Sequence, residues 1–302
     1  MTDAAGRSTP EQERIGIVVV DKPAGWTSHQ VVGRCRRIFG TRKVGHAGTL
    51  DPMATGILVI GVNRATRLLG HLMLTEKEYT ATIRLGMTTV TDDAEGERTS
   101  ALGAGNVTEA AIQAALPEFR GDILQVPTAV SAIKVDGQRA YARVRAGEDV
   151  TLKARPVTVH QLDLHEVTAT TVDGVPVLDC AVTVRCSSGT YIRAIARDLG
   201  ERLGTGGHLT VLRRTRVGPF GLDRAHTIDH ETTTLPILGL DQVAGECFDV
   251  RELNEAEAIA VGFGQRLRGV RVTGLTALVA EGRFLALYRP DGDDAVAEAV
   301  FV

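Results

Sequence analysis

The alternation of apolar and polar positions along the chain predicts a protein rich in strands. Apolar, largely β-branched residues run from Ile15 to Val20 and from Ile57 to Val62, which is typical of buried strands. Apolar and polar side chains alternate from Lys77 to Leu85, which predicts a half-buried strand. Two longer alternating runs, Val157 to Val167 and Val175 to Cys186, are predicted to be antiparallel neighbours in one sheet.

Helical periodicity interrupts the strands at two main places. The first helix is expected to have Ser28 as its N-cap and to end at Gly40, with its apolar face formed by Val31, Val32, Cys35, Ile38 and Phe39. The second is the clearest in the chain and follows Ser187-Ser188-Gly189-Thr190, with an apolar stripe of Ile192, Ile195, Ala196, Leu199 and Leu203. A strand containing Leu209, Val211 and Leu212 comes next.

The sequence pattern also predicts two shorter helices and one turn. Asn63 is expected to cap a helix that runs to Leu72, and a helix from Val107 to Leu116 is expected to end at Pro117. A run of acidic residues predicts an exposed turn and consists of Asp92, Asp93, Glu95 and Glu97.

Four outlying segments suggest the domain organisation. Residues 1–14 are polar and are expected to form a disordered tail, and residues 124–150 mix apolar and basic side chains in what is expected to be a projecting arm. Residues 231–245 carry threonines, a proline and glycines and are interpreted as a linker. Residues 271–302 have strand and turn patterns that favour a small β-barrel or sheet appended for binding.

Length and composition place the chain among ordinary globular proteins, and it is long enough for an enzyme. The 302 residues suffice for about two domains, and 43% hydrophobic with 24% charged residues excludes a largely disordered chain. No apolar run approaches the roughly 20 residues that cross a bilayer, and the start lacks an apolar signal core, so we expect a cytoplasmic protein without membrane contact. The four cysteines lack the spacing of a zinc site or a disulfide framework.

The positions of the charged residues indicate the kind of binding partner better than the net charge does. The net charge is −3, which is not the overall basicity of many nucleic-acid binders. Basic residues nevertheless gather in three groups: Arg34, Arg36, Arg37, Arg42 and Lys43; Arg213, Arg214 and Arg216; and Arg266, Arg268 and Arg271. Each group alone could be a solvated face, but together they favour a polyanionic partner.

The loop from Gly45 to Gly56 carries the leading candidate for chemistry, Asp51. Its glycines permit positive φ or a close approach of another molecule, and Pro52 restricts the backbone of Asp51 to extended conformations. A carboxylate held in this way is either a catalytic group or the cap of an Asp-Pro turn. The loop alone leaves both interpretations open.

Two further side chains stand out by their positions. Tyr79 falls on the apolar face of its predicted strand, where a core tyrosine is the common alternative to a functional one. Arg193 falls in the first turn of the clearest helix, where a cation opposes the helix dipole at a cost of about 0.3–1 kcal/mol unless an anion offsets it. Asp51 could supply that anion.

Six blocks, in this order along residues 15 to 217, resemble the TruB-type tRNA pseudouridine synthases. They are Asp21-Lys22-Pro23 with Gly25 and Thr27-Ser28; the Asp51 loop with Gly61 and Ala65-Thr66; Lys77-Glu78-Tyr79; Ser131-Ala132 with Lys134-Val135 and Gly137; Gly189-Thr190-Tyr191-Ile192-Arg193 with Asp198-Leu199-Gly200; and Leu212-Arg213-Arg214. The chain departs from the family at Arg67, where a lysine is common, and at Pro127-Thr128-Ala129-Val130, where Pro-Pro-x-Tyr is common.

The resemblance implies a fold and a domain plan. It implies a mixed α/β (α+β) class, in which a mainly antiparallel sheet forms the catalytic domain over residues 15–235, with the arm at about 124–150. It also implies a small C-terminal β-rich, PUA-like RNA-binding domain over residues 246–302, for which no distinctive motif is found in the sequence.

The resemblance also implies roles for individual residues. Asp51 would be the catalytic carboxylate, Arg193 its basic partner, and Tyr79 the residue that stacks on the target uracil and assists proton removal from C5. Leu212 would form an apolar wall beside the base, and His46 would fill the space that the everted base leaves. The remaining residues expected to bind substrate are Tyr191, Arg67 and Lys22.

The implied reaction is the isomerisation of uridine to pseudouridine at position 55 in the T-loop of tRNA, after the base is flipped out. It needs neither a metal nor a redox cofactor, because nothing is added or lost. The expected partner is the tRNA T-arm stem-loop, with no obligatory protein partner and a monomeric enzyme. Two alternatives stay open: a tRNA-binding or folding module with little catalysis, and a guide-RNA-dependent pseudouridine synthase subunit.

Overall fold

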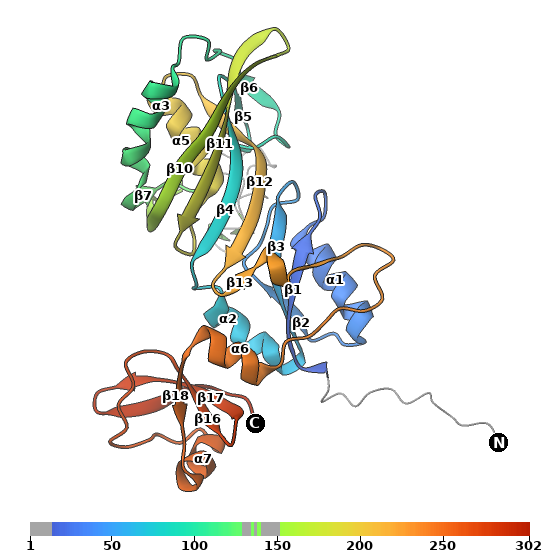
Figure 1. Ribbon diagram of the computed structural model, residues 1–302, viewed down its shortest axis with the longest axis vertical. Coiled ribbons are helices and arrows are strands. Elements are labelled where there is room, and N and C mark those ends of the chain that lie inside the picture. Colours follow the sequence, from blue (N-terminus) through green and yellow to red (C-terminus); the bar gives the residue numbers. More distant parts are fainter. Residues whose placement is uncertain (1–13, 129–133, 136–137, 140–151) are drawn as a thin grey trace, which may run out of the picture.

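The computed structural model describes residues 14–128, 134–135, 138–139 and 152–302, and it consists of a long sheet with a smaller C-terminal sheet beside it (Figure 1). The tail expected at residues 1–14 lies outside the described residues except for Arg14. Most of the arm expected at residues 124–150 also lies outside them. The mixed α/β class expected from the sequence is confirmed, since sheet dominates and helices cover its faces.

The large sheet contains ten strands among the described residues, in the order β14-β1-β3-β12-β4-β11-β10-β7, with β13 beside β12 and β2 beside β3. Their bounds are β1 (Gly16–Lys22), β2 (Val44–Ala47), β3 (Thr55–Val62), β4 (Lys77–Leu85), β7 (Gly121–Gln125), β10 (Arg155–Val172), β11 (Val175–Cys186), β12 (Gly207–Val217), β13 (Phe220–Gly221) and β14 (His226–Thr227). The predicted pairing of the two long runs is confirmed, because β10 and β11 are antiparallel neighbours.

The sheet has two halves that join at one short seam. On one side, β1 pairs with β3 along its whole length, and on the other, β12 pairs with β4 over its whole length apart from two bulges. The halves meet where β12 runs parallel to β3, and the register there joins Arg213 to Thr55 and Arg214 to Gly56. The loop with Asp51 leads directly into β3, so it lies at this seam.

Helices cover both halves of the sheet. They are α1 (Ser28–Phe39), α2 (Leu69–Leu72), α3 (Glu109–Ala115) and α5 (Ile192–Arg202), with 3₁₀ turns at Asn63–Leu68, Leu116–Phe119 and Leu222–Arg224. The residues of α1 pack with β1 and β3 in one buried cluster, while α3 and α5 pack with β4, β11 and β12 in another. Small strand pairs occur at β5 (Thr88–Thr89) with β6 (Arg98–Ser100) and at β8 (Lys134–Val135) with β9 (Gln138–Arg139).

Two expected helix caps are wrong in detail. The N-cap of α1 is Thr27, which forms a capping box with Gln30, so Ser28 is the first helical residue. Asn63 has a positive φ of 56° and begins a 3₁₀ turn without capping it; its side chain instead accepts a hydrogen bond from Thr41 (2.8 Å) and donates one to the Arg14 carbonyl. The predicted end of α1 at Gly40 is confirmed, since that residue is left-handed.

The C-terminal part consists of α6 (Leu240–Cys247), β15 (Asp249–Glu252), α7 (Glu255–Gly262), β16 (Thr276–Ala280), β17 (Arg283–Asp291) and β18 (Asp294–Val300). The four strands form one sheet with turns at Glu281-Gly282 and Gly292, as the pattern predicts. α6 occupies the second half of the segment interpreted as a linker, and its Val243 and Ala244 are buried.

One hydrophobic cluster ties this part to the large sheet. It joins Ile17 and Val59 of the large sheet to Val243 of α6 and to Leu287 and Phe301 of the C-terminal part. α6 contacts both β1 and β17, and burial of this shared apolar surface fixes the C-terminal sheet against α6 (Figure 1).

Among the described residues, none of the helices has the length and apolar character that crossing a bilayer requires.

Candidate active site

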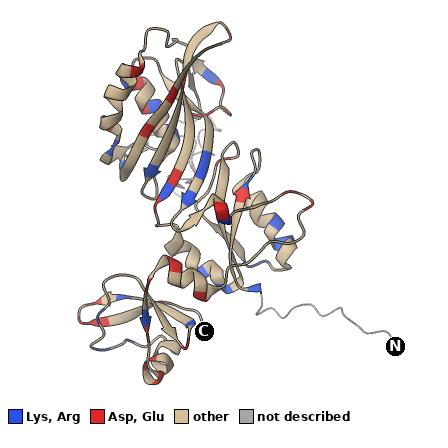
Figure 2. Ribbon diagram, viewed as in Figure 1, with Lys and Arg blue, Asp and Glu red and all other residues tan. Residues whose placement is uncertain are grey.

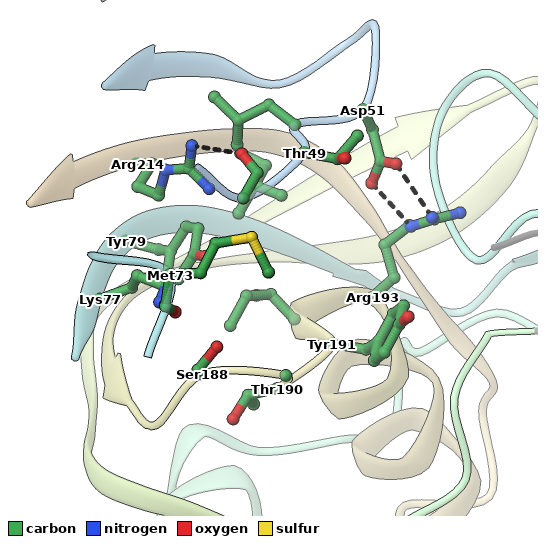
Figure 3. Close-up of a pocket in the computed structure, with 15 residues that line it drawn as sticks. Thr49, Asp51, Met73, Lys77, Tyr79, Ser188, Thr190, Tyr191, Arg193 and Arg214 are labelled. Atoms are coloured by element: carbon green, nitrogen blue, oxygen red, sulfur yellow. Dashed lines mark hydrogen bonds and ion pairs between the residues drawn. The ribbon is translucent and has the colours of Figure 1, made fainter. Parts of the chain in front are cut away.

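A cavity of about 310 Å³ opens at the seam of the large sheet, next to the Asp51 loop (Figure 3). Its size is at the lower end of the range for small-molecule sites, roughly 300–1,000 Å³. The residues that line it come from the Asp51 loop, the end of α2, β4, β12 and the turn before α5: Gly48, Thr49, Leu50, Asp51, Met73, Lys77, Tyr79, Ser188, Gly189, Thr190, Tyr191, Ile192, Arg193, Leu212 and Arg214.

The Asp51 loop is held by hydrogen bonds to the segment between β1 and α1. The Ser28 hydroxyl accepts from the Leu50 amide at 2.9 Å and donates to the Leu50 carbonyl at 3.1 Å. The Pro52 carbonyl accepts from the Gly25 amide and from the Lys22 ammonium, at 2.9 and 3.1 Å. The backbone on both sides of Asp51 is therefore fixed before any ligand arrives.

Asp51 forms a two-pronged ion pair with Arg193 (Figure 3). Its two carboxylate oxygens lie 3.1 Å from Nη2 and 3.0 Å from Nε of the guanidinium. Burial raises the pKa of the Asp51 carboxyl above its ordinary value, and the Arg193 guanidinium opposes that rise. The carboxylate thus serves as the partner of a guanidinium and not as the cap of its own turn.

Arg193 is in the first turn of α5, as predicted, and its side chain is only 7% exposed. That turn contains no acidic residue of its own, so the anions come from other segments. Asp93 is 3.2 Å from Nη1 of Arg193, and the Thr91 carbonyl accepts from the same nitrogen at 2.8 Å. The guanidinium therefore bridges two carboxylates and is fixed in position.

The exposed acidic turn expected at residues 92–97 is wrong for two of its members. Asp93 is 2% exposed and pairs with Arg193, and Asp92 accepts from Thr128 at 2.7 Å and pairs with Arg197 at 3.4 Å. Only the later residues, Glu95 and Glu97, are exposed. Asp92 and Asp93 turn inward because the two arginines of α5 share one face and need counter-ions.

Tyr79 and Leu212 form the aromatic and apolar parts of the cavity wall. Tyr79 is 7% exposed on β4, which confirms its predicted place on the apolar face, and it lies across from Arg214 in the strand register. Burial raises the pKa of the Tyr79 phenol, and the neighbouring Arg214 guanidinium partly offsets this. Leu212 is 6% exposed and lies across from Ala81.

Tyr191 lines the cavity from the N-terminal end of α5. It is the N-cap residue of the helix but caps with no side-chain hydrogen bond. Its backbone is held instead by Gln125, whose amide side chain donates to the Tyr191 carbonyl at 3.0 Å and accepts from its N–H at 2.8 Å.

Three of the residues predicted to bind substrate lie outside the cavity lining, namely Lys22, Arg67 and His46. Lys22 is fully buried, and its ammonium donates to the carbonyls of Pro23, Trp26 and Pro52, at 2.9, 2.6 and 3.1 Å. Arg67 is exposed and donates to the Val300 carbonyl at 2.8 Å. Lys22 thus supports the Asp51 loop from behind, and Arg67 contacts the C-terminal part.

His46 is half-buried on β2, in the first part of the Asp51 loop. Its ring lies edge-on to that of His29, with centroids 5.7 Å apart, and its Nδ1 is buried without a hydrogen-bond partner among the described residues. Burial, His29 and Arg214 lower the pKa of His46 to about 4, so the ring is neutral at neutral pH. A neutral ring with an unused nitrogen is suited to a contact with an incoming ligand.

Sequence reasoning missed Arg214 and Lys77 as cavity residues. Arg214 was grouped with its neighbours as a basic surface, yet it is 1% exposed and donates to the carbonyls of Ile57 and Gly48, at 2.7 and 3.0 Å. Lys77 is 6% exposed at the start of β4. The feature of the sequence that could have indicated the position of Arg214 is the glycine at position 56. An added Cβ there would be only 2.2 Å from the Arg214 carbonyl oxygen, so the two backbones approach closely.

The three expected basic groups differ in whether their side chains pair with carboxylates or are exposed. In the second group, Arg213 pairs with Asp21 at 2.7 Å and Arg216 with Glu78 at 3.0 Å, and in the third, Arg266 pairs with Asp294 at 3.2 Å. The first group keeps exposed members, Arg36, Arg37, Arg42 and Lys43. Figure 2 accordingly shows both signs of charge interspersed over the strands and the C-terminal part.

The assembled site can hold one planar ring and act on it. Asp51 and Arg193 lie at one end of the cavity, and Tyr79, Lys77 and Arg214 lie at the other (Figure 3). A fixed carboxylate is suited to nucleophilic or acid–base chemistry, and an aromatic face with an apolar side chain is suited to stacking. The arrangement thus combines a reactive oxygen with a slot for a flat, partly polar ring.

Comparison with known proteins gives three consecutive family matches. The N-terminal domain of the TruB family of pseudouridylate synthases matches residues 36–192, the C-terminal domain of tRNA pseudouridylate synthase B matches residues 193–233, and the C-terminal region of tRNA pseudouridine synthase II matches residues 248–302.

Individual relatives are similar over nearly the whole chain. The tRNA pseudouridine synthase B of Arthrobacter sp. (strain FB24) is 58% identical over 92% of this chain and 90% of its own length. The protein of the same name from Streptomyces griseus is 55% identical over 95% and 97%. Among solved structures, a Cbf5–Nop10–Gar1 complex contains a chain with a TM-score of 0.71 and 26% identity, covering 97% of this chain and 88% of that one.

Proposed function

Because this chain belongs to the TruB family of tRNA pseudouridine synthases, it isomerises uridine to pseudouridine in tRNA, and we propose that its target is the T-loop uridine at position 55 with Asp51 as the catalytic carboxylate. The observation that carries the proposal is the Asp51–Arg193 pair at one end of the cavity, with the buried ring of Tyr79 at the other. The proposal rests on the family for the reaction and on this geometry for the residues.

The size of the cavity favours an everted nucleotide. A volume of about 310 Å³ admits a single base with its ribose and is too small for a paired or stacked segment of RNA. Removing the base from the folded loop costs a few kcal/mol of stacking and pairing. We propose that stacking on Tyr79 and contact with Leu212 offset part of that cost, and that His46 occupies the space left in the RNA.

The reaction then balances without any added atom. The Asp51 carboxylate attacks an electrophilic carbon of the nucleotide, and the electron pair of the N1–C1′ bond stays with the uracil as that bond breaks. The uracil turns, the C5–C1′ bond forms, and the bond between the Asp51 oxygen and the nucleotide carbon breaks, which returns the free carboxylate. C5 then loses its proton and N1 gains one. We propose that Arg193 orients the carboxylate throughout and that the hydroxyl of Tyr79, which also lines the cavity, assists the transfer of the C5 proton.

We further propose that the purified chain acts alone, as a monomer, in the cytoplasm. The similar solved chains come from a Cbf5–Nop10–Gar1 complex and from an H/ACA ribonucleoprotein bound to a substrate RNA, and these are the reason to consider guide-dependent action. The much higher identity to enzymes named tRNA pseudouridine synthase B favours action on tRNA itself. The C-terminal sheet is then a PUA-like module that extends the tRNA-binding surface.

The Asp51→Asn variant tests the catalytic assignment. Purified protein is incubated with an unmodified T-arm stem-loop tritiated at C5 of uridine, and tritium release and RNA affinity are measured. We expect release to stop while affinity is retained, because the amide keeps the shape of the carboxyl but not its nucleophilic oxygen. A variant that releases tritium at the normal rate refutes the role of Asp51, and an unaltered protein that binds without release supports the binding-module alternative.

Asp179→Asn is the matched control. Asp179 also forms a two-pronged ion pair, with Arg84 at 2.7 and 2.6 Å, but it does not line the cavity. Its substitution is expected to leave tritium release unchanged.

A further inference from the structure

Arg214 places a full positive charge in the wall of the cavity. Its guanidinium is 1% exposed and donates to two backbone carbonyls, those of Ile57 and Gly48. Among the described residues, no carboxylate forms an ion pair with it. A guanidinium does not lose its proton in proteins, so this charge is permanent.

Lys77 adds a second buried cation beside the first. Its ammonium is 6% exposed and donates to the carbonyls of Met73 and Thr75, each at 2.6 Å. Burial and the nearby Arg214 lower the pKa of Lys77 to about 8, so the ammonium keeps its proton at neutral pH. Within the described part of the chain, no carboxylate pairs with it either.

The two cations differ in this respect from Arg193, the third buried cation named among the lining residues of the cavity. Arg193 is compensated by Asp51 and Asp93, as a buried charge normally must be. Arg214 and Lys77 lie at the other end of the cavity, around Tyr79 (Figure 3). Burying two cations there costs desolvation free energy. A negative charge that appears in the cavity during the reaction would explain why the fold bears this cost.

We propose that Arg214 and Lys77 form an electrostatic wall that stabilises the negative charge carried by the uracil ring after its bond to the ribose breaks. This inference rests on the proposed function. Whichever carbon accepts the Asp51 oxygen, electron density moves onto the uracil and its two carbonyl oxygens. The wall then stabilises the negative charge of the base, detached from the ribose, while the base turns. The charge leaves the ring when the C5–C1′ bond forms and returns to the Asp51 carboxylate when that oxygen is released.

The position of the wall favours the base over an RNA phosphate as its anion. Arg214 lies across from Tyr79 in the strand register, so it is adjacent to the ring on which the uracil is proposed to stack. A phosphate contact is expected at exposed side chains along the rim, and Arg214 and Lys77 are both buried. The attraction between such preorganised charges and the uracil is stronger in the transition state than in the initial complex. It therefore contributes little to initial RNA affinity.

The test separates the rate of isomerisation from RNA binding. Arg214→Ala, Arg214→Lys and Lys77→Met are compared in single-turnover reactions on the T-arm stem-loop, with Kd measured over a range of salt concentrations. We expect a rate loss of about 10²-fold in Arg214→Ala and Lys77→Met with Kd and its salt dependence unchanged, and partial retention of rate in Arg214→Lys. Millimolar guanidinium ion is expected to restore part of the rate of Arg214→Ala.

The control is Arg84→Met, which removes a guanidinium from the same sheet that is paired with Asp179 and lies outside the cavity lining. It is expected to keep the full rate. Thermal melts show whether a variant has lost its structure or only its rate. If Arg214→Ala does not fold, Lys77→Met still tests the inference.

Two results overturn the inference while leaving the proposed function intact: unchanged single-turnover rates, or a loss confined to Kd with a shallower salt slope, which identifies a phosphate contact. An unaltered protein that forms no pseudouridine refutes the proposed function itself, and with it this inference.

Discussion

Replacing Arg193 by methionine is expected to lower both stability and activity, and to change how activity depends on pH. The side chain is 7% exposed and lies 3.0 to 3.2 Å from two carboxylates, so its loss leaves both near each other without a counter-ion. Breaking a buried ion pair from one side costs roughly 3–5 kcal/mol. Because the Asp51 side chain is 33% exposed, water offsets part of this, and we expect a loss of about 3 kcal/mol.

The sign of the pH effect follows from the pKa of Asp51. Burial already raises that pKa and Arg193 opposes the rise, so removing the guanidinium raises the pKa further. A larger fraction of the carboxyl is then protonated at any given pH. We expect the acid limb of the single-turnover rate to move to higher pH, and part of the lost activity to return as the pH increases.

The assay compares Arg193→Met and Arg193→Lys by urea denaturation and by single-turnover rate across the pH range in which the protein stays folded. Lysine keeps the charge but not the planar fork that holds both carboxylate oxygens, so it is expected to retain the pH profile and to lose rate through misorientation, by about 10²-fold. Arg197→Met, one turn further along α5, is the control, because Arg197 pairs with Asp92 outside the cavity lining.

A methionine variant whose pH profile superimposes on that of the unaltered protein refutes the electrostatic reasoning. A stability loss no larger than that of Arg197→Met refutes the assignment of Arg193 as a bridge between the two carboxylates.

Three further predictions concern the scaffold around the site. Gly56→Ala is expected to cost about 2–4 kcal/mol in thermal or urea denaturation, because the added Cβ would lie 2.2 Å from a backbone oxygen of β12 at a φ of +98°, whereas Gly33→Ala in the open middle of α1 should stabilise by about 0.5–1 kcal/mol; equal effects would contradict the close approach. Lys22→Met should cost at least about 2 kcal/mol and slow single-turnover conversion, since three carbonyls lose their donor, and normal stability with normal rate would show that the loop does not depend on it. Arg64→Ala should speed amide hydrogen exchange at the C-terminal strand by removing the 2.7 Å bond to the Phe301 carbonyl, with unchanged exchange there as the contrary result.

The sequence predicts the strands of this fold well where one face of the strand is buried. The alternation from Lys77 to Leu85 coincides with β4, and Tyr79 is buried as the period of two requires. The unusual cation in the first turn of α5 also predicts a contact with Asp51, because an isolated Arg193 would be unfavourable there. Local physics suffices in both cases.

Other parts of the site depend on contacts that local sequence does not encode. Asp92 and Asp93 have the composition of a solvated turn, but Asp93 is buried and Asp92 half-buried because α5 brings two arginines against them. Arg214 is taken for a surface residue because β12 contains two register shifts, which break the alternation that would otherwise assign each residue to a face. The helix α6 is hidden in a polar stretch because its packing partners, β1 and β17, are far away in sequence.

Because the seam between β3 and β12 is short, the geometry of the site depends on how the two halves of the large sheet are oriented relative to each other. Asp51 belongs to the half of the sheet that contains β1 and β3, while Tyr79 and Arg193 belong to the half that contains β4 and β12, and only two register pairs join the strands between them. A small twist about this line changes the distance from the carboxylate to the stacking ring without breaking any strand. We therefore expect an RNA that contacts both halves to fix this distance, and a shorter fragment that contacts one half to leave it variable.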